Sequence, residues 1–141
     1  MDCPYPVDPK TILLRENKEL LLKSDYEIKT EPNTENYEIV YDMLENTKYY
    51  TLEIPKIIVE EGEPDGFTVG IYDFKNQRLV NQTIFDLDYC NKYGDCEWTF
   101  QTPEDSNNIA LLIYAGISGK THNIALKFEN IQLFAREPET N

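Results

Sequence analysis

An uncharged run towards the end of the chain, from Ile109 to Ala115, constrains the fold more than any other stretch. Its seven residues are rich in β-branched and aromatic types, and Gly116 follows it directly. A short apolar run of this composition, closed by a turn residue, is typical of a strand that is covered on both faces. The sequence therefore predicts a β-sheet with this strand near its centre.

The next apolar stretch alternates between two faces. From 124 to 128, every second residue is a large apolar one, which is the period of a strand with one buried face. The apolar pair that follows, Ile131 and Leu133, is shifted by one position. Because a one-residue shift turns side chains to the opposite face, the pattern predicts a bulge near Glu129 and Asn130. Such a bulge would turn the Glu129 carboxylate towards a neighbouring group.

Further extended segments precede this region, and turn signals separate them. They cover residues 37–42, 48–59, 68–74, 82–87 and 97–101, with Pro55 interrupting the second. Short strands spaced about ten residues apart, with no helix predicted between them, indicate an all-β fold, a two-sheet antiparallel β-sandwich. The segment 11–23 fits two short strands or one strand after a linker, and its leucines also fit one stripe of a helix.

The length of 141 residues suits one domain with an ordinary core. We expect a leader or linker over 1–18, the β-sandwich over 19–136 and a tail over 137–141. No apolar run is long enough to cross a bilayer, and the first residues lack the basic flank and apolar core of a signal peptide. The chain is then either cytosolic or a segment of a larger secreted or surface protein, and we expect an extracellular or cell-surface location.

The chain is strongly acidic, with a formal net charge of −13 and a sequence pI near 4.4. Nucleic acid and anionic membranes both attract basic surfaces, so this charge argues against either as a partner. Solubility outside a cell explains the acidity, and carboxylates gathered around a divalent cation are the alternative.

Three cysteines are present, and two of them flank a short loop. Cys90 and Cys96 are separated by a turn-rich stretch whose ends a disulfide could join, and two free thiols are the alternative. A zinc site would need more ligands than the single histidine can add. We predict a Cys90–Cys96 bridge, and the role of Cys3 is open.

Four short motifs occur in a fixed order. They are Glu-Leu-Leu-Leu-Lys-Ser-Asp-Tyr-Glu at 19–27, Leu-Glu-Asn-Thr-Lys-Tyr-Tyr-Thr-Leu at 44–52, Thr-Phe-Gln-Thr-Pro at 99–103 and Phe-Glu-Asn-Ile-Gln-Leu at 128–133. In this order and spacing the chain resembles galactose-binding-like jelly rolls, the fold of several carbohydrate-binding module families. The resemblance implies a jelly roll built from roughly residues 19 to 134.

The resemblance also implies a structural calcium ion. In such modules the ion lies between the opening acidic residue and that of the last strand, which correspond here to Glu27 and Glu129. Calcium prefers several carboxylate and carbonyl oxygens, so the residue types fit. The family's opening asparagines are replaced by Glu19 and Lys23, and its last-strand aspartate by Glu129. The alternative is that both carboxylates face solvent or accept hydrogen bonds.

Sugar binding requires an exposed aromatic ring beside polar side chains. Four aromatic residues are candidate ligand contacts: Tyr72, Tyr93, Trp98 and Tyr114. Tyr72 and Tyr114 alternate with apolar residues, which places them on the outer or concave side of a sheet. Trp98 shares a face with Phe100, so the core is its alternative place. For each tyrosine, a structural role is the alternative.

No catalytic constellation is visible in the sequence. The only histidine, His122, falls in a predicted hairpin loop, and neither Ser118 nor Cys90 has a recognisable nucleophile motif around it. We therefore expect a non-catalytic module that binds a glycan. A protein-interaction or spacer domain is the alternative, and a small hydrolase using a pair such as Asp86 and Glu97 is a third hypothesis.

Overall fold

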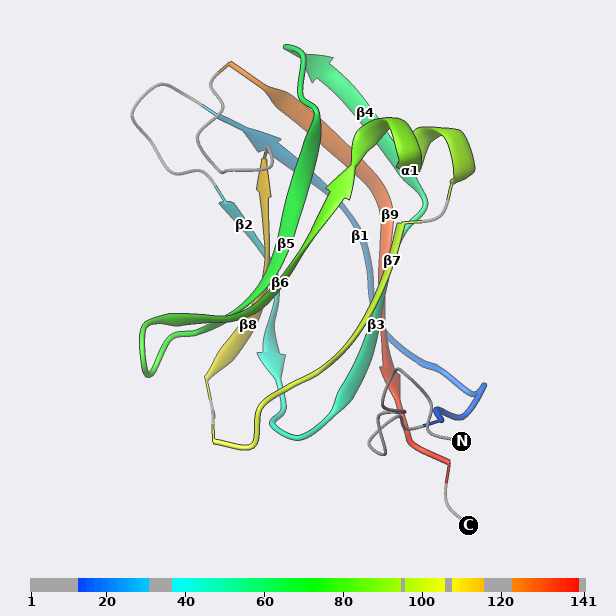
Figure 1. Ribbon diagram of the computed structural model, residues 1–141, viewed down its shortest axis with the longest axis vertical. Coiled ribbons are helices and arrows are strands. Elements are labelled where there is room, and N and C mark those ends of the chain that lie inside the picture. The colour runs from blue at the N-terminus through cyan, green and yellow to red at the C-terminus, as the bar shows by residue number, and fades with distance from the viewer. Residues whose placement is uncertain (1–12, 31–36, 95, 106–107, 116–122, 140–141) are drawn as a thin grey trace, which may run out of the picture.

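A computed structural model describes residues 13–30, 37–94, 96–105, 108–115 and 123–139. Two antiparallel sheets pack face to face, so the predicted all-β sandwich is confirmed, and the arrangement is compatible with a jelly-roll-like fold (Figure 1). One sheet contains β1 (Glu19–Lys29), β9 (Ala125–Arg136), β3 (Tyr49–Ile54) and β7 (Cys96–Gln101) in that order, with β4 (Lys56–Glu61) also paired to β9. The other contains β2 (Tyr37–Leu44), β8 (Ile109–Ala115), β5 (Gly66–Asp73) and β6 (Arg78–Asp86).

Strand β8 lies inside the four-stranded sheet, between β2 and β5. Its inward residues Leu111 and Ile113 are fully buried, and Leu112 on its opposite face is only 2% exposed. Burial on both faces is what the uncharged run of this strand predicts.

Strand β9 carries the predicted bulge. Ser24 pairs with Ile131 but Tyr26 pairs with Phe128, so β9 holds one residue more than β1 over this step. Asn130 adopts the left-handed conformation, with φ of 58°. Its N–H donates to the Asp25 Oδ1 atom of β1 at 2.9 Å, which provides an acceptor for the amide that the bulge removes from the ladder.

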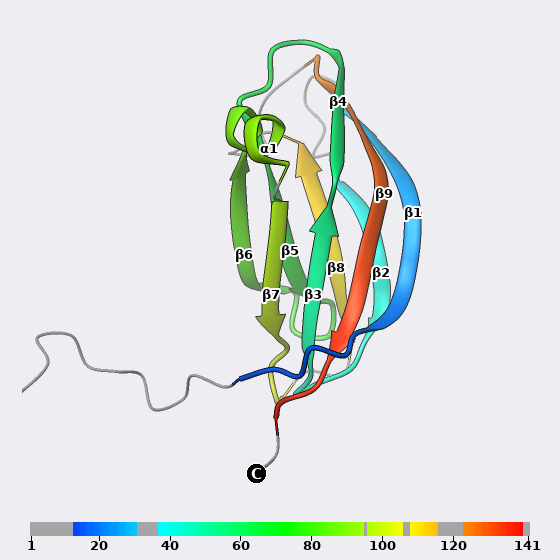
Figure 2. The same cartoon turned by 90° about the vertical axis from the view of Figure 1, so that its right-hand side faces the viewer.

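The extended segment 48–59 forms two strands that follow one another along β9 (Figure 2). Strand β3 ends at Ile54 and β4 begins at Lys56, so the predicted interruption at Pro55 is confirmed. Proline has no N–H to donate to a ladder, which is why the break occurs there.

Helix α1 (Leu87–Tyr93) connects β6 to β7, where the sequence predicts the end of a strand and a loop. Local capping explains the difference. The Asp86 carboxylate accepts a hydrogen bond from the Tyr89 N–H at 2.9 Å, and Gly94 ends the helix with φ of 64°. The Asp86 and Gly94 caps frame a short helix of about two turns, which the strand periodicity does not reveal.

The segment before β1 is extended where the structure describes it. Leu14 forms an isolated antiparallel bridge with Pro138, and the Arg15 N–H donates to the Glu137 carbonyl at 2.8 Å. Strand β1 then begins at Glu19, so the helical alternative for this stretch is wrong in its described part. The two ends of the described chain thus lie side by side (Figure 1).

The core lies between the sheets and is rich in aromatic rings. Phe67 of β5 stacks on Phe85 at 5.2 Å between ring centroids and meets Phe128 of β9 edge-on at 5.0 Å. A polar link also joins the sheets, because the Tyr26 hydroxyl donates to the Val40 carbonyl at 2.9 Å. Apolar burial and this hydrogen bond together fix how the two layers pack.

Candidate functional site

The outer face of the four-stranded sheet gathers apolar and aromatic side chains. Inward residues of β5 such as Val69 and Ile71 are fully buried, so the alternate residues Gly70 and Tyr72 turn outwards. We call this surface the aromatic face, and the residues that define it are Tyr37, Ile39, Gly70, Tyr72, Leu79, Ile84, Leu112 and Tyr114.

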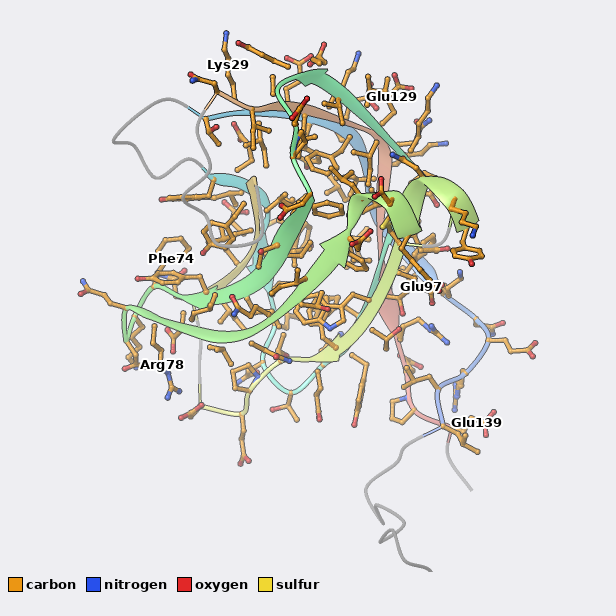
Figure 3. All side chains as sticks on the ribbon, turned by 45° about the horizontal axis from the view of Figure 1, so that its top comes forward. Lys29, Phe74, Arg78, Glu97, Glu129 and Glu139 are labelled. Carbon is orange, nitrogen blue, oxygen red and sulfur yellow. A yellow bond between two sulfur atoms is a disulfide. The ribbon has the colours of Figure 1, made fainter. Side chains whose placement is uncertain are left out.

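Tyrosines mark both ends of the aromatic face. Tyr114 is opposite Tyr37 in the β2–β8 register, and their ring centroids are 6.0 Å apart at an angle of 54°. Tyr72 lies four residues along β5 from Thr68, the partner of Tyr114, which corresponds to about 13 Å of strand. Tyr72 meets the Phe74 ring edge-on at 4.9 Å, near the β5–β6 hairpin (Figure 3).

Gly70 forms the floor between these tyrosines. A Cβ atom built on it would lie 2.9 Å from Leu79 Cδ1 and 3.6 Å from Tyr114 Cε2. Both side chains therefore lean over the bare backbone of β5, and any larger residue at 70 would have to displace Leu79. The glycine leaves room for the Leu79 and Tyr114 side chains to approach each other over β5, with Thr68 and Gln82 as polar neighbours on the same side.

Several side chains of the aromatic face remain open to solvent. Relative exposure is 46% for Tyr37, 41% for Ile39, 41% for Leu79 and 50% for Ile84. These residues lie on β2 and β6, the two edge strands of the sheet, and flank the buried Leu112 in its centre. Isolated exposed apolar residues are ordinary, whereas these four lie on one side of one sheet.

Two of the four aromatic residues predicted as ligand contacts lie on this face, and two do not. Tyr72 and Tyr114 point outwards from β5 and β8, as the alternation predicts. Tyr93 lies on α1, 59% exposed, with its ring centroid 4.7 Å from that of Tyr89. Trp98 lies half-buried on β7 of the other sheet, its ring 4.6 Å from Phe100, where it packs against the core. The four residues therefore do not form one site.

The remaining residues of the aromatic face were not singled out from the sequence. Tyr37 and Ile39 occur at alternate positions of β2, as do Ile84 and the amide-bearing Gln82 on β6. Alternation alone does not say which face is covered by the second sheet. The pairing of β2 with β8 and of β6 with β5 supplies that missing information.

Glu27 and Glu129 lie on the outer side of the five-stranded sheet, beside lysines. Glu27 is opposite Lys127 in the β1–β9 register. The Glu129 carboxylate lies 3.9 Å from the Lys56 ammonium group, so it is turned towards a neighbour as expected (Figure 3). Among the described residues no group of three or more His, Cys, Asp or Glu could hold a metal ion. Calcium at Glu27 and Glu129 stays a prediction.

Cys90 of α1 and Cys96 of β7 lie at disulfide distance, with their Cα atoms 5.5 Å apart. Both side chains are buried, at 5% and 4% exposure. The pairing predicted from the sequence is therefore supported, and it ties the helix to the edge of the five-stranded sheet. Cys3 lies outside the described residues.

The hydrolase hypothesis gains no geometry from the described residues. Asp86 is engaged as the cap of α1, and Glu97 on β7 is opposite Glu53 of β3. His122 and Ser118 lie outside the described residues.

The half-buried Tyr26 and the buried Tyr50 have perturbed pKa values. Burial raises the pKa of Tyr26, and the nearby Glu38 charge adds to this rise, while a hydrogen bond with Ser24 opposes it. Burial likewise raises the pKa of Tyr50, whose hydroxyl accepts a hydrogen bond from the Glu45 N–H at 2.9 Å. Both phenols are structural, since one joins the sheets and the other holds the turn before β3.

Comparisons with known proteins find no matching family model, no matching curated protein and no matching solved structure. In the part of the chain that the structure describes, none of the helices has the length and apolar character needed to cross a membrane.

Proposed function

We propose that this protein is a non-catalytic binding module that docks onto another protein through its aromatic face. One observation carries the proposal: Tyr37, Ile39, Leu79 and Ile84 are all more than 40% exposed on one side of one sheet. Tyrosine and large aliphatic residues are typical of the buried centre of a protein interface. Docking would remove them from water, and that burial would drive association.

The charge of the chain restricts the partner. At a net charge of −13, two copies would repel each other, which disfavours self-association. A partner with an apolar centre would pack against the exposed aliphatic residues. A neutral or basic rim on that partner would complement the negative charge of this chain. We therefore propose a partner of that kind, rather than a second copy.

Glycan binding is the second candidate function, and the tyrosines favour it. Tyr37, Tyr72 and Tyr114 place three rings on the aromatic face, and a pyranose stacks on such rings through its apolar C–H face. The resemblance to galactose-binding-like carbohydrate-binding modules supports the same reading. Glycan binding is placed second because the aromatic face also exposes aliphatic residues, whereas sugars need hydrogen-bonding groups more than aliphatic surface.

The proposed setting is the secreted or surface part of a larger protein. A Cys90–Cys96 disulfide would persist in an oxidising compartment and would be reduced in the cytosol of most cells. The acidic composition is consistent with that location.

Site-specific photo-crosslinking tests the docking proposal. A benzophenone amino acid is placed at Ile84 on the aromatic face or, as the matched control, at Lys92 on the exposed side of α1. The protein is irradiated in an extract of its source cells, and adducts are identified by mass spectrometry. The proposal predicts one protein adduct that forms from position 84 and not from position 92.

The identified partner is then purified and titrated against variants. Ile84→Asp should weaken its binding at least tenfold, because a charge would be buried at an apolar contact, and Lys92→Gln should not change it. A glycan array is run in parallel with Tyr37→Ala. Equal binding by wild type and Ile84→Asp would refute docking, and glycan binding that Tyr37→Ala abolishes, without any protein adduct, would establish the second candidate instead.

A further inference from the structure

A groove of about 660 Å³ lies where the two ends of the described chain meet, on the sheet opposite to the one that carries the aromatic face. We call it the terminal groove, and its lining includes Arg15, Lys18, Lys48, Tyr49, Gln101 and Arg136. Next to the lining residues Glu137 and Pro138, the Glu139 N–H donates to the Leu13 carbonyl at 2.7 Å. Figure 3 labels Glu139. The volume is within the range of small-molecule sites.

Four basic side chains line this groove together with two carboxylates, Glu19 and Glu137, in a chain that is strongly acidic. Three of them are compensated by carboxylates. Lys48 lies 2.8 Å from Glu45, Lys18 lies 3.1 Å from Glu53, and Arg15 lies 3.6 Å from Glu137, measured between charged atoms.

Arg136 is the exception among these four. Its Nη1 atom donates to Thr51 Oγ1 and its Nη2 atom to the Arg15 carbonyl, each at 2.9 Å. Both acceptors are neutral, and no described carboxylate pairs with the guanidinium. The Nε atom is buried and has no hydrogen-bond partner among the described residues. A half-buried guanidinium that is held only by neutral acceptors, and whose Nε lacks an acceptor, is a group with which an anion can pair.

The other groups of the groove indicate what kind of anion fits. Tyr49, Gln101 and Asn17 offer hydroxyl and amide groups beside Arg136. Such groups bind hydroxyls of a ligand, whereas the guanidinium fork suits a planar carboxylate. A ligand with one carboxylate and several hydroxyls would use both sets.

We propose that the terminal groove binds a small polyhydroxy carboxylate, with Arg136 as the residue that pairs with the carboxylate group. This site is separate from the aromatic face and does not depend on the docking function. It also assigns a role to the pairing of the chain ends, because Arg15 and Arg136 come from opposite ends and one holds the other in place.

Isothermal titration with gluconate tests the proposal, and sorbitol, which has the same carbon chain without the carboxylate, is the matched neutral ligand. Inorganic phosphate is the third probe and separates carboxylate recognition from general anion binding. Gluconate should bind at millimolar concentration or below, more weakly as salt is added, and sorbitol should not bind. Equal affinity for phosphate and gluconate, or no heat with gluconate, would overturn the proposal.

Three variants locate the binding. Arg136→Gln should weaken gluconate binding at least tenfold, Arg136→Lys should lose less, and Lys92→Gln on α1 should bind as wild type does. Because Arg136 also bonds to Thr51, the melting temperature of each variant is measured first. If Arg136→Gln does not fold, Lys48→Gln at the exposed rim should still weaken binding two- to threefold. Unchanged affinity in the folded Arg136 or Lys48 variants would contradict the site.

Discussion

The two sheets present very different outer faces to their surroundings. Across the five-stranded sheet, oppositely charged side chains approach each other: Lys56 and Glu129 lie 3.9 Å apart on the paired strands β4 and β9, and Lys29 and Glu61 lie 3.9 Å apart on β1 and β4, on either side of β9. Across the four-stranded sheet, the corresponding positions hold Tyr37, Ile39 and Ile84. Both sheets are antiparallel and bury their inner faces in one core, so the fold does not require this difference.

The docking proposal accounts for the apolar outer face of the four-stranded sheet. A solvent-facing side of an antiparallel sheet is normally polar, and the five-stranded sheet carries ion pairs there, although Leu20 of β1 is also 50% exposed. Exposed apolar residues on edge strands carry a risk of aggregation. Their presence on β2 and β6 is explained if a partner covers them, and the predictions below test whether these residues serve binding or stability.

The largest loss of stability is expected when a buried residue on the inner side of the four-stranded sheet is shortened. Ile71→Ala should lower the free energy of unfolding by about 3 kcal/mol, because it empties part of a fully buried site between the sheets. Ile84→Thr on the outer side of the same sheet should change it by less than about 0.5 kcal/mol. Urea unfolding followed by Trp98 fluorescence measures both. Similar losses in the two variants would show that the outer residue is part of the fold's stability.

The cross-link between Cys90 of α1 and Cys96 of β7 should give the next largest loss of stability when it is removed. The double variant Cys90→Ser with Cys96→Ser should lose about 2 kcal/mol, because a cross-link between residues six apart in sequence restricts the unfolded chain only modestly. Unfolding in the presence and absence of a reducing agent checks this value. Wild type in reductant should match the double variant, and a wild type that reductant leaves unchanged would mean that no disulfide forms.

Because the Tyr26 hydroxyl joins the two sheets, the free energy of unfolding should fall at alkaline pH. Burial raises the pKa of Tyr26 in the folded state, so this contribution is complete below the unfolded value of about 10 and is lost as pH rises through the folded value. Tyr26→Phe should cost about 1 kcal/mol at neutral pH, through the lost bond to Val40, and should flatten the decline above pH of about 10. If the free energy of unfolding of this variant falls with alkaline pH as steeply as that of wild type, other groups cause the decline, and Tyr50 is the first to test.

The smallest effect is expected on the charged outer face. Lys56→Gln should change the free energy of unfolding by less than about 0.5 kcal/mol, because its ion pair with Glu129 is exposed and long. The same substitution at Lys92 is the control, since Lys92 is exposed on α1 with its Nζ atom 5.3 Å from the centroid of the Tyr93 ring. A loss above about 1 kcal/mol at Lys56 alone would show that this face contributes to stability through its charges. It would also narrow the contrast between the two sheets.

Sequence patterns were sufficient for much of the fold. The uncharged run at 109–115 identified a strand buried on both sides, and the shift after Phe128 located the bulge at Asn130. Both features depend on local alternation, which the sequence displays directly. Helix α1 was missed because its few residues show no helical period, and its Asp86 and Gly94 caps are equally common in turns.

The candidate sites were less accessible to sequence reasoning. Tyr72 and Tyr114 could be placed on an outer face, but their neighbours come from strands distant in sequence. The terminal groove likewise requires Arg15 and Arg136 to meet, although they are 121 positions apart. Pairing between distant segments is set by the whole topology, so no local pattern specifies it.

Hydroxyl-radical labelling of two tyrosines tests the central claim most directly. Tyr37 on the aromatic face and Tyr93 on α1 are 46% and 59% exposed, so both should be oxidised in the purified protein. In an extract of the source cells, docking predicts that Tyr37 becomes protected while Tyr93 stays reactive. Equal oxidation of Tyr37 in the extract and in the purified protein would contradict the assignment of the aromatic face as a docking surface.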